Sequence, residues 1–231
     1  MSQQGWNRLA AEFETSVCDI TATSGAQIAK LVALTKPNRR KTLVDAGCGI
    51  GTFVERFGES FGKIIAFDFA SAMVKRTRRR CSDFNHAEWQ ALPLEDAGAK
   101  FGAVAHLAVC LNVITSPKPS LRERQWVSLG QLVRPNGHLL VVVPSLESAR
   151  YVAEMDEEAF HGSVDGASEL VRRNDTEQKH YSRQELRRIV THQNFEVIAV
   201  RRVSYPWEDD GLELTERKSP WDWACVARKN A

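Results

Sequence analysis

The sequence predicts an α/β fold, a doubly wound and mostly parallel sheet in a single domain of 231 residues. Short apolar runs alternate along the chain with segments of helical periodicity, and this alternation builds parallel βαβ units. The first apolar run ends in "DAGCGIG", with three glycines at alternate positions directly before a helical segment. A chain of this length, 43% apolar, can bury one core and is short for two ordinary domains.

The first half of the chain supplies the opening βαβ units. Apolar residues at helical spacing in residues 24–35, followed by Pro37, predict a helix before the first strand. The elements that follow are predicted in strict alternation. They are a strand at 41–47, a helix at 52–60, a strand at 63–69, a helix at 70–80 and a strand at about 86–89.

The middle of the chain holds the most deeply buried strands. Residues 102–114, "GAVAHLAVCLNVI", are almost continuously apolar, which is typical of a strand covered on both faces. Residues 121–133 have a helical apolar stripe, residues 134–137 ("RPNG") predict a turn, and residues 138–144 predict the next buried strand.

After Pro144 the alternation stops. Residues 145–180 are polar and without clear period, so we expect an irregular, mobile lid that covers an acceptor pocket together with the N-terminal segment. Helical periodicity returns at 181–194, where Ser182 and Glu185 form a capping-box pattern. Residues 195–203 and 221–229 predict the last two strands.

Composition excludes several classes of protein. The formal net charge of +2 gives no overall field that would attract a polyanion, so any nucleic-acid contact would need a local patch. No apolar run approaches the roughly 18 residues that span a bilayer. The cysteines are odd in number, scattered and without a C-x-x-C pair, which indicates a reduced, cytoplasmic protein without a cysteine metal site. They are Cys18, Cys48, Cys81, Cys110 and Cys225.

The glycine loop lies where open α/β sheets bind ligands, at the carboxyl end of the first strand. Glycine there permits tight-turn angles and lets a ligand approach the main chain. Asp45 precedes the loop and Asp68 ends the second strand, an arrangement that suits a nucleoside with a charged tail. A dinucleotide and an empty turn are the alternatives, and Thr52 in place of a third motif glycine argues against a pyrophosphate.

Four segments taken together resemble the successive motifs of class I S-adenosylmethionine-dependent methyltransferases. They are "VDAGCGIGTF", "IIAFDFASAMV", "LAVCLNVI" and "LVRPNGHLLVVVPS", in the order and approximate spacing of that family. The resemblance implies a Rossmann-like sheet of seven strands, the last of them antiparallel and formed by "WDWACVARK". It also implies one domain in four parts, namely an N-terminal helical cap (1–40), a cofactor-binding core (41–144), the lid (145–180) and a C-terminal helix with two strands (181–231).

The same resemblance implies a site for S-adenosylmethionine. Asp45 would lie near the amino group of the cofactor, Asp68 would hold the ribose hydroxyls, and Phe69 would lie against the adenine. Glu88 stands where the family more commonly has an aspartate near the adenine amino group. The full expected set is Asp45, Gly47, Cys48, Gly49, Gly51, Asp68, Phe69, Glu88 and Trp89.

Methyl transfer depends chiefly on positioning, and it needs a general base only when the acceptor must lose a proton. Asn112 at the end of the fourth strand and His180 beside the lid are the expected catalytic residues. Trp6, Tyr181 and Trp207 are the expected substrate contacts. His106 lies inside an apolar run and is expected to be structural rather than a base. No metal is implied.

The expected acceptor is a small molecule. The motifs of amino-directed and cytosine-C5 nucleic-acid methyltransferases are missing, since the fourth strand ends in "CLNV". An RNA or protein methyltransferase is the alternative, with residues 75–80 ("KRTRRR") as its contact surface, and a non-catalytic S-adenosylmethionine-binding regulator is a second. Nucleic acid and membrane are not favoured as partners, and a homodimer is left open.

Overall fold

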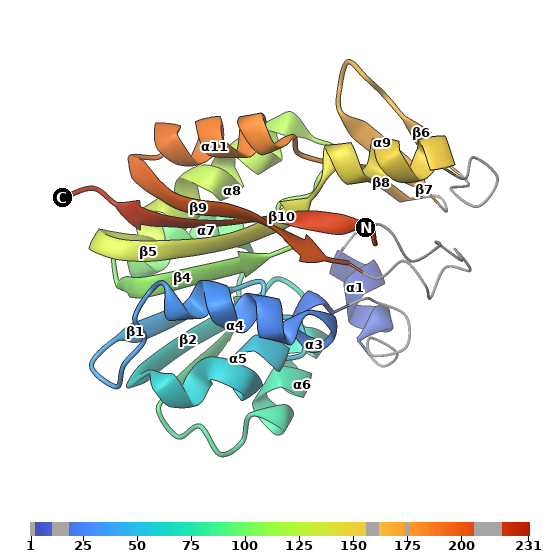
Figure 1. Ribbon diagram of the computed structural model, residues 1–231. Helices are drawn as coiled ribbons and strands as arrows, with labels where there is room; N and C mark the ends of the chain where they lie inside the picture. Colours follow the sequence, from blue (N-terminus) through green and yellow to red (C-terminus); the bar gives the residue numbers. More distant parts are fainter. Residues whose placement is uncertain (1–2, 11–18, 156–161, 174–175, 206–218) are drawn as a thin grey trace.

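The computed structural model describes residues 3–10, 19–155, 162–173, 176–205 and 219–231. It contains a seven-stranded sheet with helices on both faces, in the order β3-β2-β1-β4-β5-β10-β9 (Figure 1). The strands from β3 to β5 are parallel, and β10 is antiparallel to both of its neighbours. The strands are β1 (Thr42–Ala46), β2 (Lys63–Asp68), β3 (Ala87–Ala91), β4 (Ala105–Leu111), β5 (Val133–Pro144), β9 (Phe195–Ser204) and β10 (Trp221–Lys229). The predicted fold, including the antiparallel last strand, is confirmed.

Each central strand contributes side chains to two apolar cores, because successive side chains point to opposite faces of the sheet. In β1, Leu43 packs into one apolar cluster while Val44 and Ala46 pack into the other. Helices cover both faces of the sheet (Figure 1). One face carries α4 (Gly25–Ala33), α5 (Thr52–Phe57) and α6 (Ser71–Arg80), and the other carries α7 (Leu94–Phe101), α8 (Pro119–Leu132) and α11 (Arg183–His192).

In the described part of the chain, further short helices lie outside these two layers. They are α1 (Gln3–Leu9), α3 (Ile20–Thr23) directly before α4, and the 3-10 turn η1 (Gly58–Ser60) that ends α5. None of the helices in the described ranges is long and apolar enough to cross a membrane. The cytoplasmic location and the four-part division of the domain stay predictions.

The predicted irregularity of residues 145–180 is wrong for the described part of this segment, whereas the mobile lid stays a prediction. This segment contains a helix, α9 (Leu146–Met155), and a separate antiparallel sheet of β6 (Gly162–Val164), β7 (Leu170–Arg173) and β8 (Thr176–Lys179). Val171 packs with Leu146, Ala149 and Val152 of α9 in a small core of their own. Strands of three or four residues are too short for alternation to appear in the sequence, and this explains the error.

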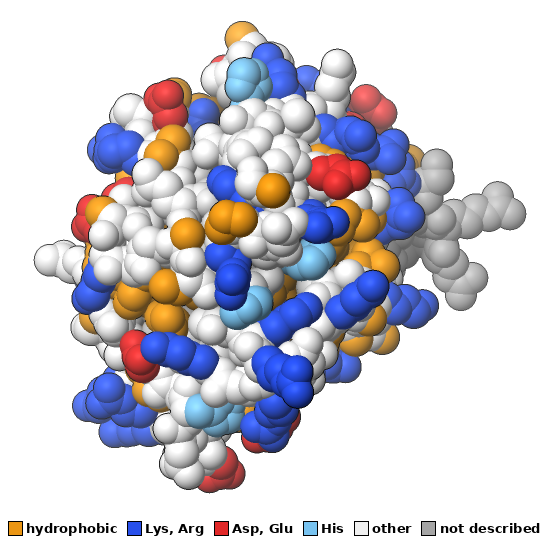
Figure 2. All heavy atoms as spheres, turned by 90° about the vertical axis from the view of Figure 1, so that its left-hand side faces the viewer, with side chains coloured by type: hydrophobic (Ala, Val, Ile, Leu, Met, Phe, Trp, Pro, Cys, Tyr) orange, Lys and Arg blue, Asp and Glu red, His pale blue; other side chains and the backbone are white. Residues whose placement is uncertain are grey.

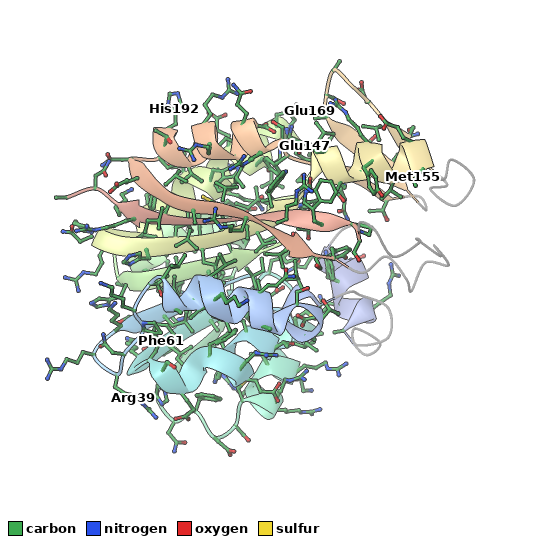
Figure 3. The ribbon with its side chains drawn as sticks, viewed as in Figure 1. Arg39, Phe61, Glu147, Met155, Glu169 and His192 are labelled. Atoms are coloured by element: carbon green, nitrogen blue, oxygen red, sulfur yellow. The ribbon has the colours of Figure 1, made fainter. Side chains whose placement is uncertain are left out.

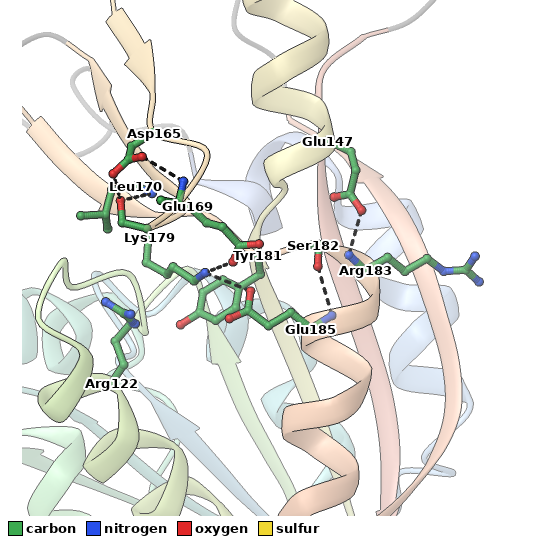
Figure 4. A network of polar contacts seen from close by, with 12 residues as sticks. Arg122, Glu147, Asp165, Glu169, Leu170, Lys179, Tyr181, Ser182, Arg183 and Glu185 are labelled. Carbon is green, nitrogen blue, oxygen red and sulfur yellow. Dashed lines mark hydrogen bonds and ion pairs between the residues drawn. The ribbon is translucent and has the colours of Figure 1, made fainter.

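A buried lysine ties this small sheet to the main domain (Figure 4). Lys179 at the end of β8 is 4% exposed and pairs with Glu169 and, at 3.0 Å, with Glu185 of α11. Its ammonium also lies 5.3 Å from the ring centroid of Tyr181. Ser182 caps α11 as predicted, accepting from the Glu185 N–H, but the Glu185 carboxylate turns to Lys179 instead of completing the capping box.

The "RPNG" segment is not a free turn between two elements. It lies inside β5, where the register slips between the pairs Ala105–Val133 and Leu107–His138, and Asn136 has a positive φ of 63°. The extra residues therefore bulge out at the amino end of the sheet.

Candidate active site

The glycine loop joins β1 to α5, and its backbone requires glycine. Gly47, Gly49 and Gly51 all have positive φ, at 80°, 52° and 88°. A Cβ on Gly47 would lie 2.3 Å from Val113 Cγ2, and one on Gly51 would lie 2.8 Å from Thr77 Cγ2. The loop thus needs glycine both for its left-handed angles and for the close approach of the segment after β4 and of α6.

Asp68 ends β2 and holds the glycine loop in place. Its two carboxylate oxygens accept from the N–H groups of Gly49, at 3.1 Å, and Ala70, at 2.8 Å. Burial raises the pKa of Asp68 to about 6, while these two hydrogen bonds act in the opposite direction. A carboxylate has about four acceptor positions, so two remain for the hydroxyls of a ligand.

Asp45 is a buried acid with an unused oxygen. The side chain is 3% exposed, and its Oδ2 has no hydrogen-bond partner among the described residues. Burial raises its pKa to about 8, and the nearby carboxylates of Asp68 and Asp19 add to the effect. A buried, unpaired carboxyl is costly unless a cation or a donor reaches it. The ammonium group of S-adenosylmethionine fits this requirement, and the loop with Asp68 fits its ribose.

A second buried polar pair lies at the ends of β4 and β10. Asn112 follows β4 with a positive φ of 54°, and its Nδ2 donates to Asp222 Oδ2 at 2.7 Å. Asn112 Oδ1 is buried without a partner among the described residues. Burial raises the pKa of Asp222 to about 7, opposed by the hydrogen bonds from Asn112 and the Ser145 N–H. Asp222 was missed in the sequence, where the only signal is a carboxylate between two tryptophans in an apolar strand.

His180 contacts Ser145, the residue that follows β5. Its Nδ1 is 3.3 Å from the Ser145 carbonyl, and burial lowers its pKa to about 4, so the ring is neutral near pH 7. Asn112, Asp222 and His180 are therefore gathered around the end of β5. Tyr181 is used structurally, since its hydroxyl donates to the Ile114 carbonyl at 2.7 Å.

Comparison with known proteins decides the family. A family model described as a methyltransferase domain matches residues 22–200, which is more than half of the chain. The chain belongs to this family. The protein is therefore a class I methyltransferase that uses S-adenosylmethionine. No curated protein sequence matches it.

Solved structures resemble the methyltransferase over nearly its whole length. The N-methyltransferase NodS from Bradyrhizobium japonicum WM9, with S-adenosylhomocysteine, has a TM-score of 0.70 at 13% identity and covers 99% of this chain and 98% of its own. A putative methyltransferase in complex with the Haloferax volcanii Trm112 activator has 0.68 at 11%, covering 98% of both chains. The Burkholderia thailandensis 1,6-didemethyltoxoflavin-N1-methyltransferase has 0.66 at 16%, covering 100% and 92%. These likenesses show the shared fold.

The N-terminal helix of the methyltransferase packs beside the expected cofactor site. Trp6 on α1 contacts a cluster that contains Ile50 of the glycine loop and Met73 of α6, with Phe69 at its edge. Asn7 Oδ1 accepts from the Ala72 N–H at 2.9 Å. Trp6 and Phe69 thus pack against the same small cluster, and the N-terminal cap and the contacts of both residues with ligands stay predictions.

The other predicted cofactor residues of the methyltransferase lie partly in the glycine loop and partly away from it. Glu88 pairs with Lys63 at 2.9 Å and stands level with Ile65, three positions before the end of β2. The structure therefore does not bring Glu88 to the edge that holds Asp68. Trp89 points to the opposite face and packs against an apolar core cluster. Cys48 is buried in the loop, with Sγ 3.7 Å from Thr77 Oγ1. Trp207 lies outside the described residues.

His106 lies near the start of β4, at the opposite end of the strand from Asn112, and its Nδ1 accepts from the Thr42 N–H at 3.1 Å. This position excludes it as the base for methyl transfer at the carboxyl edge, and its bond to β1 matches the expected structural role.

Proposed function

We propose that the methyltransferase acts on a small molecule held at the carboxyl end of β4 and the amino end of β10, beside Asn112 and Asp222. The observation that carries the proposal is the buried Asn112–Asp222 pair, which has one unused carbonyl oxygen and one carboxylate. Buried polar groups normally find partners, so an unused oxygen at this edge suits a hydroxyl or amine of a ligand.

The residues of the site divide into two groups with separate tasks. Asp45 and Asp68 would hold S-adenosylmethionine, which supplies a methyl group activated by its sulfonium. Asn112 Oδ1 would accept a hydrogen bond from the acceptor and so orient it. Asp222 would take the proton that a hydroxyl or amine loses, because a base with a pKa near 7 is well matched to neutral conditions. His180, with its pKa of about 4, is the weaker base.

Two observations favour a small acceptor over RNA. Part of the basic run on α6 serves internal contacts, since Arg80 pairs with Glu55 at 2.7 Å and Arg76 donates to the Ala10 carbonyl. These residues do not form a free stripe for phosphates. One structure of the same fold holds the small molecule 1,6-didemethyltoxoflavin.

The test uses S-adenosylmethionine with a tritiated methyl group, incubated with small-molecule, RNA and protein fractions of a cell extract. We expect protein-dependent label in the small-molecule fraction alone. The Asp68→Ala variant, which should bind the cofactor poorly, is the control. Label that it still transfers does not depend on the cofactor site. Label only in RNA or protein would refute a small acceptor while leaving the methyltransferase assignment intact. A homodimer stays a prediction.

A further inference from the structure

A hollow of about 280 Å³ lies at the amino end of the sheet, opposite the glycine loop. It is lined by Lys41, His106, His138 and the bulge 134–137 of β5. Figure 2 looks onto this face and shows Lys, Arg and His side chains gathered across its centre, with few acidic ones among them. His106 and Asn112 are six positions apart along β4, on the order of 20 Å at about 3.3 Å per residue. The hollow is thus remote from methyl transfer.

His106 presents a hydrogen-bond conflict in this hollow. Its Nδ1 accepts from the backbone N–H of Thr42, so the proton of the neutral ring must sit on Nε2. Nε2 lies 2.8 Å from Nη1 of Arg134, and a guanidinium nitrogen can only donate. Two donors therefore face each other without an acceptor between them. An anion with several oxygens could accept from both.

The positive charge around the hollow is not balanced. Lys41 donates to the carbonyls of Thr35 and Lys36, at 2.8 and 2.7 Å, and Arg228 donates to Asn136 Oδ1 at 2.6 Å. Among the described parts of the chain, no carboxylate forms an ion pair with any of the surrounding cations. These cations are Lys36, Lys41, Arg134 and Arg228. Four positive charges thus gather here in a protein whose net charge is only +2.

The two imidazoles respond to this surplus of charge. Burial lowers the pKa of both His106 and His138, and the neighbouring cations lower it further. Both rings are therefore neutral N–H donors near pH 7 when the hollow holds no anion, and they add no charge to the four cations.

The wall of the hollow is built before any ligand arrives. Asn136 has a left-handed backbone, and a Cβ on Gly137 would lie 2.7 Å from the Ala105 carbonyl, so the bulge packs directly on the start of β4. This fixes the backbone that carries Arg134. The volume of about 280 Å³ is just below that of small-molecule sites, which begin at roughly 300 Å³, so the hollow suits a single compact group.

We propose that this hollow binds a phosphate-type oxyanion, either free or as the phosphate group of a small molecule. Arg134 and the His106 Nε2–H donate to its oxygens, and Lys41 with Arg228 supplies further positive charge. The site is independent of the methyl acceptor, because it lies at the other end of the sheet. Its loss would leave the glycine loop and the Asn112–Asp222 pair unchanged.

The experiment is a titration of the full chain with inorganic phosphate, and in parallel with ribose 5-phosphate, followed by calorimetry and by the imidazole ¹⁵N resonances. We expect saturable binding. We also expect the ¹⁵N resonances to show that the His106 ring is protonated at Nε2, and the Nε2 resonance to shift as phosphate binds. Arg134→Gln should weaken binding at least ~10-fold, since it removes a charged donor. The matched control is Arg124→Gln, which removes the same charge from an exposed position on α8.

Each outcome decides the proposal. Arg228→Gln is a second variant that removes a positive charge from the hollow, at an exposed position. If Arg134→Gln does not fold, Arg228→Gln still tests the proposal. Tighter binding of the ester supports a phosphorylated small molecule, and equal binding of both supports free phosphate. No saturable binding, or equal affinity in Arg134→Gln and Arg124→Gln, overturns the site. RNA binding that depends on Arg134 and that phosphate does not displace also overturns it, in favour of a polynucleotide.

Discussion

Replacing Asp45 with asparagine should stabilise the ligand-free protein and weaken its binding of S-adenosylmethionine. The folded pKa of Asp45, about 8, lies above its ordinary value of 3.8. A carboxyl whose pKa is raised on folding contributes stability at low pH and loses it as pH rises through the folded pKa. At about 1.4 kcal/mol per pH unit, the interval from 3.8 to pH 7 corresponds to roughly 4 kcal/mol lost by the free protein.

Thermal unfolding between pH 5 and 8 measures this effect. The difference in melting temperature between Asp45→Asn and the parent should grow with pH up to about 8. Even a quarter of the calculated energy, about 1 kcal/mol, raises Tm by about 2–4 °C in a chain of this size. Asp83→Asn, at an exposed carboxylate, is the control and should show no such growth.

Calorimetry completes the test, since binding of a cation beside Asp45 should ionise it. Near pH 7 the parent should release close to one proton as S-adenosylmethionine binds, measured in buffers of different ionisation enthalpy, and Asp45→Asn should release none. A variant that melts no higher than the parent at pH 8 and releases the same proton would show that Asp45 is not a buried, uncompensated acid.

Four further changes test the rest of the site. Asp68→Ala should weaken S-adenosylhomocysteine binding by about 1.5–3 kcal/mol, because it removes charged hydrogen bonds to the ribose, and unchanged affinity by calorimetry would exclude that contact. Asp222→Asn should lower kcat by about 10²-fold and abolish a rise in rate through pH 7, where Asp222 ionises; a pH profile that keeps this rise would place the base elsewhere. His180→Gln should retain most turnover if Asp222 is the base, and a loss as large as that of Asp222→Asn would reverse the two roles. Lys179→Met should lower the free energy of unfolding by about 3–5 kcal/mol, because Glu169 and Glu185 would lose their shared cation, and denaturant unfolding that matches the parent would contradict this.

Most of the fold could be predicted from the sequence because its central strands are buried on both faces. A run such as "HLLVVVP" has no polar position that would suit a surface helix, and β5 lies where it predicts. The glycine loop was predictable for a related reason. Three glycines at alternate positions after a strand indicate left-handed backbone, and all three have it. Here local sequence and tertiary structure impose the same requirement.

The features that the sequence did not predict depend on contacts between residues far apart in the chain. Asp222 lies 110 positions from Asn112, and only the antiparallel pairing of β10 with β5 brings the two together. Glu88 occupies the expected place in the sequence motif, but the register of β3 against β2 sets it level with Ile65. The small sheet was not predicted because its apolar positions, among them Val171, form a core only by packing against α9. The helix α9 itself contacts the core through Glu147, which is labelled in Figure 3, since its carboxylate accepts from Trp223 Nε1 at 2.8 Å.

The overall charge of +2 conceals an uneven distribution of ionisable groups along the sheet. Buried carboxyls gather at the edge formed by the carboxyl ends of the parallel strands, at Asp45, Asp68 and Asp222, and each has a pKa raised by burial. Unpaired cations gather at the amino ends, around His106 and His138. Because the two groups lie on the order of 20 Å apart, beyond a Debye length of about 8 Å, neither strongly affects the charge preference of the other. A cationic ligand is therefore favoured at one end and an anion at the other, and a balanced composition is no argument against either site.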